Sequence, residues 1–405
     1  MPPQQRPDGV SLLGICHLAQ QTPRPERRLL RRIELAVAVG IALSLSLSFS
    51  GCGRGTPTFG RSERDTVYVG VAVGLTSPER YVNVFEGVQL ALDELNKKRG
   101  PKTPALALQR APSSATSPVA IAAAFRDNPK VIGVVGHTES DATIAAAPVY
   151  ADRAHDGRDP LVVVSPTASA AAVTRVSTWI FRVCPTVGEQ ARTLARYVAD
   201  SLGHRRAGVL YRNDPSGKDF LRAFREEFEK KNGVVTERDP FTEQISEFDA
   251  YALRLVKTNA QSVVIAGNSP QERSIIRALH QAGGKQSVIG TNAPLSSDTG
   301  DFRGLHYAML YSPDRATTRE GAHFAEAFRA RTGKSADHWG ALAYDAAMLI
   351  GTAVHEKGPD RKAIRDWLAG VGRTRAAFPG ATGLIRFDEN RDPVNTTVLV
   401  GEVTR

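Results

Sequence analysis

The sequence predicts an α/β fold built as two lobes, each a doubly wound parallel sheet covered by helices. Short apolar runs rich in Val, Ile and Ala alternate with longer segments of helical spacing, and the alternation occurs twice along the chain. The apolar runs lack polar interruptions, which is typical of parallel strands buried on both faces. The two halves share a rhythm but not a sequence, so we expect two lobes rather than a tandem duplication.

The first series of strands and helices begins at residue 67. In its first helix Val88, Leu92 and Leu95 recur at helical spacing and fall on one face. A strand followed by a helix is the repeating unit of parallel sheets. The expected pairs of strand and helix are 67–73 with 85–96, 131–135 with 140–153, and 161–164 with 168–173.

The second series repeats this order after residue 206. Its first two helices end at Asn232-Gly233 and Gly283-Gly284, residues that tolerate the left-handed conformation common after a helix. A final short strand is expected at 287–289. The expected pairs are 207–211 with 218–232 and 262–266 with 270–283.

The pattern changes after the apolar run 305–310 to helices without intervening strands. A strand pair then follows, 384–387 and 396–403, joined by an Asp-, Asn- and Pro-rich segment typical of a hairpin connection. This order indicates a return of the chain to the first lobe and then to the second. The expected helices are 317–331, 339–355 and 360–371.

The N-terminal segment has the features of an export signal. Five arginines between residues 24 and 32 precede the apolar stretch 35–49, which ends in Ser50-Gly51-Cys52. This arrangement resembles a bacterial lipoprotein signal, in which the cysteine becomes the lipid-bearing N-terminus. An uncleaved membrane anchor is the alternative, although fifteen residues are short for a span that needs about 20. We therefore expect a signal peptide at 1–51, lipidation of Cys52, a flexible tether at 52–65 and an extracytoplasmic body.

Composition and motifs exclude several classes of function. The formal charge of +10 is spread along the chain and mixed with acids, without the basic, aromatic-rich block of a nucleic-acid-binding protein. Once Cys16 leaves with the signal and Cys52 is lipidated, Cys184 has no partner for a disulfide or a metal cluster. The chain has no Gly-x-Ser-x-Gly elbow and no His-Glu-x-x-His motif. We expect no catalytic residue, cofactor or metal.

Several short motifs occur in an order that resembles the type I periplasmic binding proteins, especially the branched-chain amino-acid-binding proteins of ABC transporters. The resemblance covers about residues 66–403. It implies two lobes joined by three crossovers, with lobe I at 66–184 and 308–378 and lobe II at 185–307 and 379–405. The ligand would lie between them, beyond the carboxyl ends of the strands. The motifs lie at 67–74, 86–96, 131–137, 164–169, 247–255, 262–267, 344–347 and 383–388.

In the first lobe, the resemblance implies that Ser140, Ser169 and the backbone of Thr167 hold a ligand carboxylate. The alternative for both serines is helix capping, since serine is a preferred N-cap residue. Tyr81 lies in the loop after the first strand, where an aromatic side chain would cover the ligand; a surface tyrosine is the other interpretation.

The second lobe departs from the amino-acid-binding pattern. Ser216 stands where the family carries an aromatic residue, and Asn292 stands where it carries an acid for the ligand ammonium. Asn268 also lies at a position for a ligand contact. The resemblance therefore implies a more polar and less acidic pocket, and an ordinary branched-chain amino acid is not the expected ligand.

The sequence thus predicts a monomeric solute-binding lipoprotein, not an enzyme, held at the outer side of the cell membrane. It would capture a small amino-acid-like or amide-like ligand between its lobes and deliver it to an ABC permease. The alternative is a ligand sensor that reports to a membrane receptor or kinase. An enzyme on the same architecture would need an acid–base pair in the cleft, and the motifs supply none.

Overall fold

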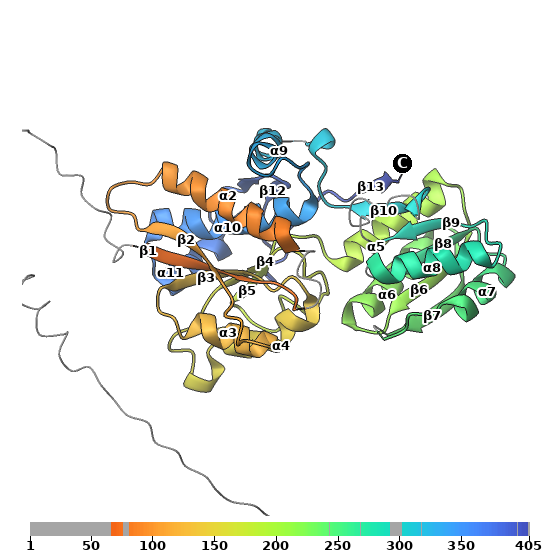
Figure 1. Ribbon diagram of the computed structural model, residues 1–405, viewed down its shortest axis with the longest axis horizontal. Helices are drawn as coiled ribbons and strands as arrows, with labels where there is room; N and C mark the ends of the chain where they lie inside the picture. Colours follow the sequence, from red (N-terminus) through yellow and green to blue (C-terminus); the bar gives the residue numbers. More distant parts are fainter. Residues whose placement is uncertain are drawn as a thin grey trace, which may run out of the picture. The chain divides into compact units, whose positions relative to one another are not determined.

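The computed structural model describes residues 66–75, 81–242, 244–267, 269–291, 302–316, 318–394 and 396–403. The predicted signal and tether, with Cys52, lie outside these residues, as do Asn268 and Asn292. No helix within the described ranges is long and apolar enough to cross a membrane. The described chain forms two α/β lobes with parallel sheets, which confirms the predicted fold class (Figure 1).

Lobe I is built on a five-stranded parallel sheet in the order β2-β1-β3-β4-β5. The central strands are apolar and buried along their whole length, as expected for strands covered on both faces. The strands are β1 (Thr66–Ala72), β2 (Ala105–Arg110), β3 (Val131–Gly136), β4 (Val163–Ser165) and β5 (Ile180–Arg182).

Helices cover both faces of this sheet (Figure 1). On one face Val135 packs in a core with Leu92 and Ile350, from α2 and α10. On the other, Val134 packs with residues of α3 and α4. The helices of lobe I are α2 (Val82–Lys97), α3 (Pro118–Arg126), α4 (Ser140–Tyr150), α9 (Arg319–Thr332), α10 (His338–Lys357) and α11 (Arg361–Gly370).

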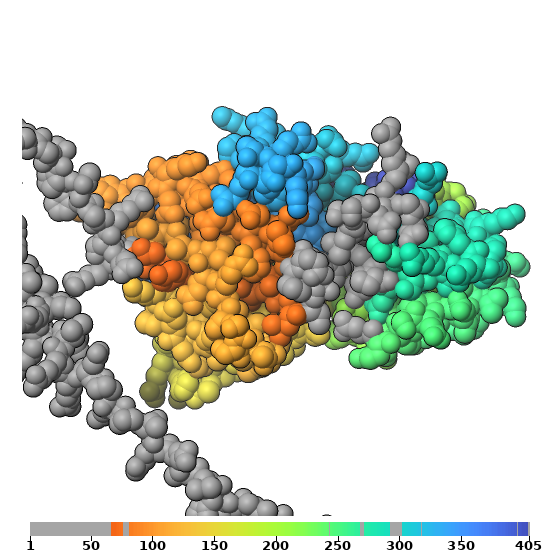
Figure 2. Space-filling model, viewed as in Figure 1, coloured from red at the N-terminus to blue at the C-terminus, as the bar shows by residue number. Residues whose placement is uncertain are grey.

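Segments distant in sequence meet on the surface of lobe I. Figure 2 shows α9, in blue, beside α2, in orange. Arg331 of α9 places its Nε 2.8 Å from Glu86 Oε2 and its Nη1 2.8 Å from Asp93 Oδ2. The late helical block therefore returns to the first lobe, as the sequence pattern indicated.

Lobe II contains a six-stranded sheet in the order β13-β10-β9-β8-β6-β7, parallel except for β13. Helices α5 (Val187–Arg196) and α6 (Pro215–Lys230) cover one face, and α7 (Asp249–Lys257) and α8 (Ser269–Gln281) the other. The strands are β6 (Arg206–Arg212), β7 (Val234–Phe241), β8 (Ser262–Ala266), β9 (Ser287–Gly290), β10 (His306–Met309) and β13 (Leu399–Glu402).

The chain passes between the lobes three times: after β5, after β10 and before β13. The predicted hairpin of 384–387 with 396–403 is wrong. Strand β12 (Gly383–Ile385) pairs with β11 (Phe378–Gly380), whereas β13 pairs with β10 in the other lobe. Ala381, Ile385 and Phe387 belong to the core of lobe I, so the final crossing comes after residue 387 rather than at 379.

The third crossover is held to lobe I by a buried arginine. Arg182 is 0% exposed, and its Nε lies 2.7 Å from Asp392 Oδ1. The hydroxyl of Thr174 donates to the same oxygen at 2.7 Å. Nη1 of Arg182 donates to Ala170 O at 2.6 Å, and Arg391 Nη2 donates to Thr174 O at 2.6 Å. These bonds fix the path of the chain where it leaves for lobe II.

Candidate functional site

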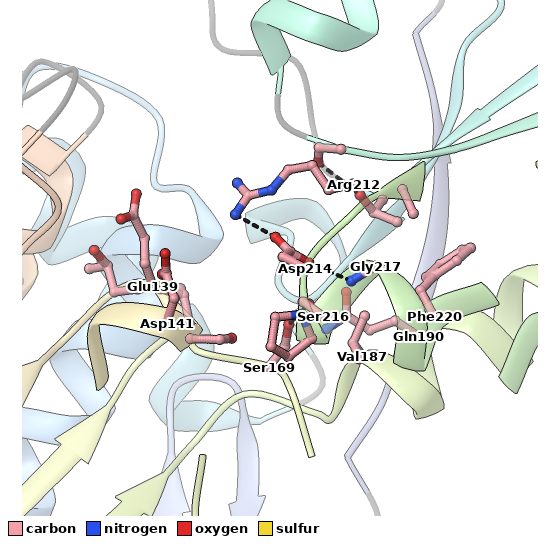
Figure 3. A pocket seen from close by; sticks show the side chains of 17 residues that line it. Glu139, Asp141, Ser169, Val187, Gln190, Arg212, Asp214, Ser216, Gly217 and Phe220 are labelled. Atoms are coloured by element: carbon pink, nitrogen blue, oxygen red, sulfur yellow. Dashed lines mark hydrogen bonds and ion pairs between the residues drawn. The ribbon is translucent and has the colours of Figure 1, made fainter. Parts of the chain in front are cut away.

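A cavity of about 150 Å³ lies between the lobes, and residues of both lobes line it (Figure 3). Its lining comes from the ends of β6 and β8, from the segments that follow β3, β4, β6, β8 and β9, and from the first turn of α5 in lobe II. The carboxyl ends of parallel strands are where open α/β sheets bind ligands. The fold therefore places this cavity where the sequence predicted a ligand.

The loops after β3 and β4 are joined by hydroxyl groups. Thr167 Oγ1 donates to Thr138 O at 2.7 Å, and Ala170 N donates to Ser140 Oγ at 3.1 Å. Gly74, after β1, donates its N–H to Thr138 Oγ1 at 3.0 Å. This side of the cavity is consequently a bonded unit of three neighbouring loops.

Neither of the predicted serines of lobe I caps a helix. Helix α4 begins at Ser140 with Glu139 as its N-cap residue, and no side chain makes a capping bond there. Ser169 lies in a segment of bends and turns, and the helix predicted at 168–173 is not formed. Ser169 Oγ instead lies 3.5 Å from Ser216 Oγ of the other lobe. The capping interpretation is therefore wrong for both serines.

A buried histidine, His137, holds the loop after β3 in place. His137 Nε2 lies 3.0 Å from the hydroxyl of Tyr150, and Ser165 Oγ donates to His137 O at 2.6 Å. Burial lowers the pKa of His137 to about 3, so the ring is neutral at physiological pH. His137 does not line this cavity but borders a neighbouring one, and its bonds hold the loop.

On lobe II, the start of α6 presents a charged pair to the cavity. Asp214 is the N-cap residue of α6, and its Oδ1 accepts a bond from Gly217 N at 2.7 Å. Its other oxygen, Oδ2, lies 2.5 Å from Arg212 Nη2. Ser216, in the first turn of α6, also lines the cavity, and its contact with a ligand stays a prediction. Figure 3 shows this pair across the cavity from Glu139.

Tyr81 does not line the cavity. It is 1% exposed, which excludes the surface interpretation, and its ring packs edge-on against Trp339 with centroids 5.7 Å apart. Its hydroxyl donates to Glu139 Oε1 at 2.8 Å. Tyr81 therefore reaches the cavity through Glu139, and its predicted role as a cover for the ligand stays a prediction.

The structure adds seven lining residues with polar side chains that the sequence analysis did not select: Thr138, Glu139, Asp141, Gln190, Arg212, Asp214 and Thr291. Glu139 and Asp141 flank Ser140 in the chain, so their position next to a predicted contact could have identified them from the sequence. Arg212 and Asp214 follow a predicted strand directly. Gln190 belongs to a helix that the sequence pattern did not indicate, and no local signal identified it.

A second cavity of about 330 Å³ shares part of this lining. Glu139, Asp141 and Arg212 border both cavities, whereas Val73 and Ile121 give the second one an apolar wall. Across the described part of the chain, no group of three His, Cys, Asp or Glu side chains is placed to hold a metal ion. The arrangement offers hydrogen bonds and charge to a solute.

Comparison with known proteins places this architecture in context. A family model for periplasmic binding proteins matches residues 66–405. Leu/Ile/Val-binding protein homolog 1 from Brucella abortus (strain 2308) is 23% identical, covering 83% of this chain and 90% of that protein. A leucine-binding protein from Thermotoga maritima has a similar solved structure, with a TM-score of 0.73 and 24% identity, covering 84% of this chain and 96% of its own. An ABC transporter solute-binding protein from R. palustris, solved with 4-hydroxybenzoate, gives 0.70 at 18% identity, covering 84% and 93%.

Proposed function

The chain belongs to the periplasmic binding protein family, and we propose that it captures a small polar solute, amino-acid-like or amide-like, between its two lobes. Members of this family are extracytoplasmic solute-binding proteins rather than enzymes. The observation that carries the proposal is the cavity, because both lobes line it at the carboxyl ends of their strands. A solute that contacts both lobes stabilises the closed arrangement over the open one.

The proposed contacts combine hydroxyl groups from both lobes. Ser140, Thr167, Ser169 and Ser216 all line the cavity. The predicted contacts Asn268 and Asn292 directly follow the lining residues Gly267 and Thr291 in the chain, and we retain them as proposals. Because hydroxyl groups both donate and accept, they suit a polar solute of either kind.

We further propose that the protein acts as a monomer, is tethered to the membrane through a lipid on Cys52, and delivers its solute to the permease of an ABC transporter. The support is the lipoprotein-like segment before Cys52 and the similarity to binding proteins of such transporters. Anchoring through two or more acyl chains is far more durable than through one.

A thermal-shift screen of the mature protein tests solute capture. The compounds are amino acids, amides, urea-like compounds and small carboxylates. A true ligand at about 100 times its Kd should stabilise the protein by about 2.7 kcal/mol, because it binds only the folded state. Failure of every compound to raise the melting temperature would count against the proposal.

Serine variants then test the site. We expect Ser140→Ala and Ser169→Ala to weaken binding of the best compound by about fivefold each, as typical hydrogen bonds contribute about 1 kcal/mol. Ser201→Ala, an exposed serine outside the cavity lining, is the matched control. Since Ser140 also bonds Ala170 N, the stability of each variant without ligand is measured in parallel. Unchanged affinity in both cavity variants would show that the solute binds elsewhere.

A further inference from the structure

Within the described part of the chain, the lining of the cavity between the lobes has more negative than positive side chains. Among the described residues, its ionisable lining side chains are Glu139, Asp141, Arg212 and Asp214. The 2.5 Å contact between Arg212 and Asp214 pairs one positive with one negative charge. Glu139 and Asp141 form no ion pair with any described residue. Two carboxylates therefore face the cavity without a paired cation among residues 66–75, 81–242 and the other described ranges.

Each of these carboxylates keeps one oxygen available. Glu139 Oε1 accepts the bond from Tyr81, and Asp141 Oδ1 accepts a bond from Ala142 N at 2.9 Å. The second oxygens, Glu139 Oε2 and Asp141 Oδ2, accept no bond from the described chain. Both residues lie at the start of α4, where the helix dipole favours acids. The helix dipole therefore explains why two acids are tolerated at this position.

Gln190, on the opposite side of the cavity, supplies a further acceptor. The side chain is 6% exposed and lines the cavity. Its Nε2 donates to Pro185 O at 3.1 Å, and because a carbonyl only accepts, this bond fixes which end of the amide is nitrogen. The amide oxygen accepts no bond among the described residues. This oxygen can take a hydrogen bond from a donor group on the solute.

The one cation in the described lining, Arg212, is already paired with an acid. Asp214 already engages the guanidinium of Arg212, and the hydroxyl of Thr167 donates to a backbone carbonyl. A solute carboxylate would therefore approach Glu139 and Asp141 with no unengaged cation in the described lining to offset the repulsion.

We propose that the solute is a small cation whose N–H donors, in an ammonium, amidinium or guanidinium group, bind Glu139 and Asp141. The inference rests on the proposed function, because it specifies the ligand of the same cavity. Charge-assisted hydrogen bonds to carboxylates favour such a group over a neutral group of the same shape by about ten- to hundredfold in affinity.

Isothermal titration of the mature protein with charge-matched pairs tests this directly. L-Arginine is compared with L-citrulline, and agmatine with N-carbamoylputrescine, since each pair keeps its shape and differs in charge. Glutamate and 4-hydroxybenzoate form the anionic set. We expect the cationic member of at least one pair to bind about tenfold more tightly than its neutral partner. The preference should decrease in high salt, which screens partly exposed charges.

Glu139→Gln and Asp141→Asn keep side-chain shape and remove the charge. Each variant should reduce the cation preference by about tenfold, whereas Asp156→Asn, an exposed acid beyond the other end of α4, should leave it unchanged. Thermal unfolding without solute checks that the variants fold.

The outcomes separate this inference from the proposed function. Tighter binding of neutral or anionic compounds, or an unaltered preference in both cavity variants, would overturn the cationic assignment while leaving solute capture established. Absence of binding by every cationic, neutral and anionic compound would overturn the assignment and the proposed function together.

Discussion

Gly217 shows how a single residue shapes the second lobe's contribution to the cavity. At the turn from β6 into α6, a Cβ on residue 217 would lie 2.0 Å from Arg212 O, closer than any real contact. The backbone of Arg212 therefore approaches α6 only because residue 217 has no side chain. The same turn presents Asp214 and Ser216 to the cavity.

We expect Gly217→Ala to displace this turn. The overpacking should lower the free energy of unfolding by about 1–3 kcal/mol, measured by urea denaturation. Solute affinity, measured by calorimetry, should fall as well because Asp214 and Ser216 move together. Gly100→Ala is the control, since its Cβ would meet nothing closer than 3.6 Å. Equal stability of the two variants would show that the turn adjusts without cost.

The sequence located part of the site at this scale. Ser140, Thr167, Ser169 and Ser216 were selected because the family resemblance implies ligand contacts at these positions, and the fold brings all four to the lining of one cavity. The hydrogen bonds of these side chains could not be predicted from the local sequence, because they join loops that are distant in the chain. Gln190 illustrates the limit, since a helical glutamine carries no local sign of facing a cavity.

At the scale of elements, Asp345 of α10 ties down the turn between β11 and β12. This fully buried carboxylate accepts bonds from Ala381 N at 2.6 Å, Thr382 N at 2.9 Å and Thr382 Oγ1 at 2.6 Å. Burial raises its pKa from 3.8 to about 6, although these bonds act in the opposite direction. The folded protein therefore holds this proton more tightly than the unfolded chain.

This raised pKa predicts a specific pH dependence. The stability that the protonated group contributes is complete below about pH 4 and is lost as the pH rises to about 6. Asp345→Asn does not titrate. Urea denaturation should therefore show the unfolding free energy of the wild type falling, relative to the variant, by about 3 kcal/mol over that range. His137 titrates in both proteins and cancels. A constant difference between the two would contradict the prediction.

Long helices and buried strands were predictable, because amphipathic spacing and apolar runs are local signals. Helix α6, predicted at 218–232, and strand β3 were located this way. The edge strand β7 was missed, since it is half-buried and contains Pro240.

The predicted helix at 168–173 fails for a tertiary reason. Arg182 takes the carbonyls of Ala168 and Ala170, and Ser140 Oγ and Asp219 Oδ2 take the N–H groups of Ala170 and Ala171. A helix over 168–173 would pair Ala168 O internally, so the bond from Arg182 competes with it, and the other three bonds fix these backbone groups in a non-helical path.

For the whole molecule, the connections between lobes set the limit of sequence reasoning. The segment 388–393 forms the tight turn that its composition predicted, with Val394 N donating to Arg386 O at 2.8 Å. Beyond this turn the chain leaves its expected partner and pairs antiparallel with β10. A local pattern identifies a strand, but the partner depends on which sheet has a free edge.

The attachment of the whole molecule to the membrane gives the last prediction. If Cys52 carries the lipid, Cys52→Ala should move the protein from the membrane fraction to the soluble extracytoplasmic fraction or leave it as an unprocessed precursor. Mass spectrometry of the mature wild-type protein should show that residues 1–51 are missing. An uncleaved anchor predicts the opposite: both proteins would stay with the membrane and retain the N-terminal segment without lipid. The apolar stretch 35–49 favours the first result, because fifteen residues fall short of the roughly 20 that a helix needs to span the bilayer.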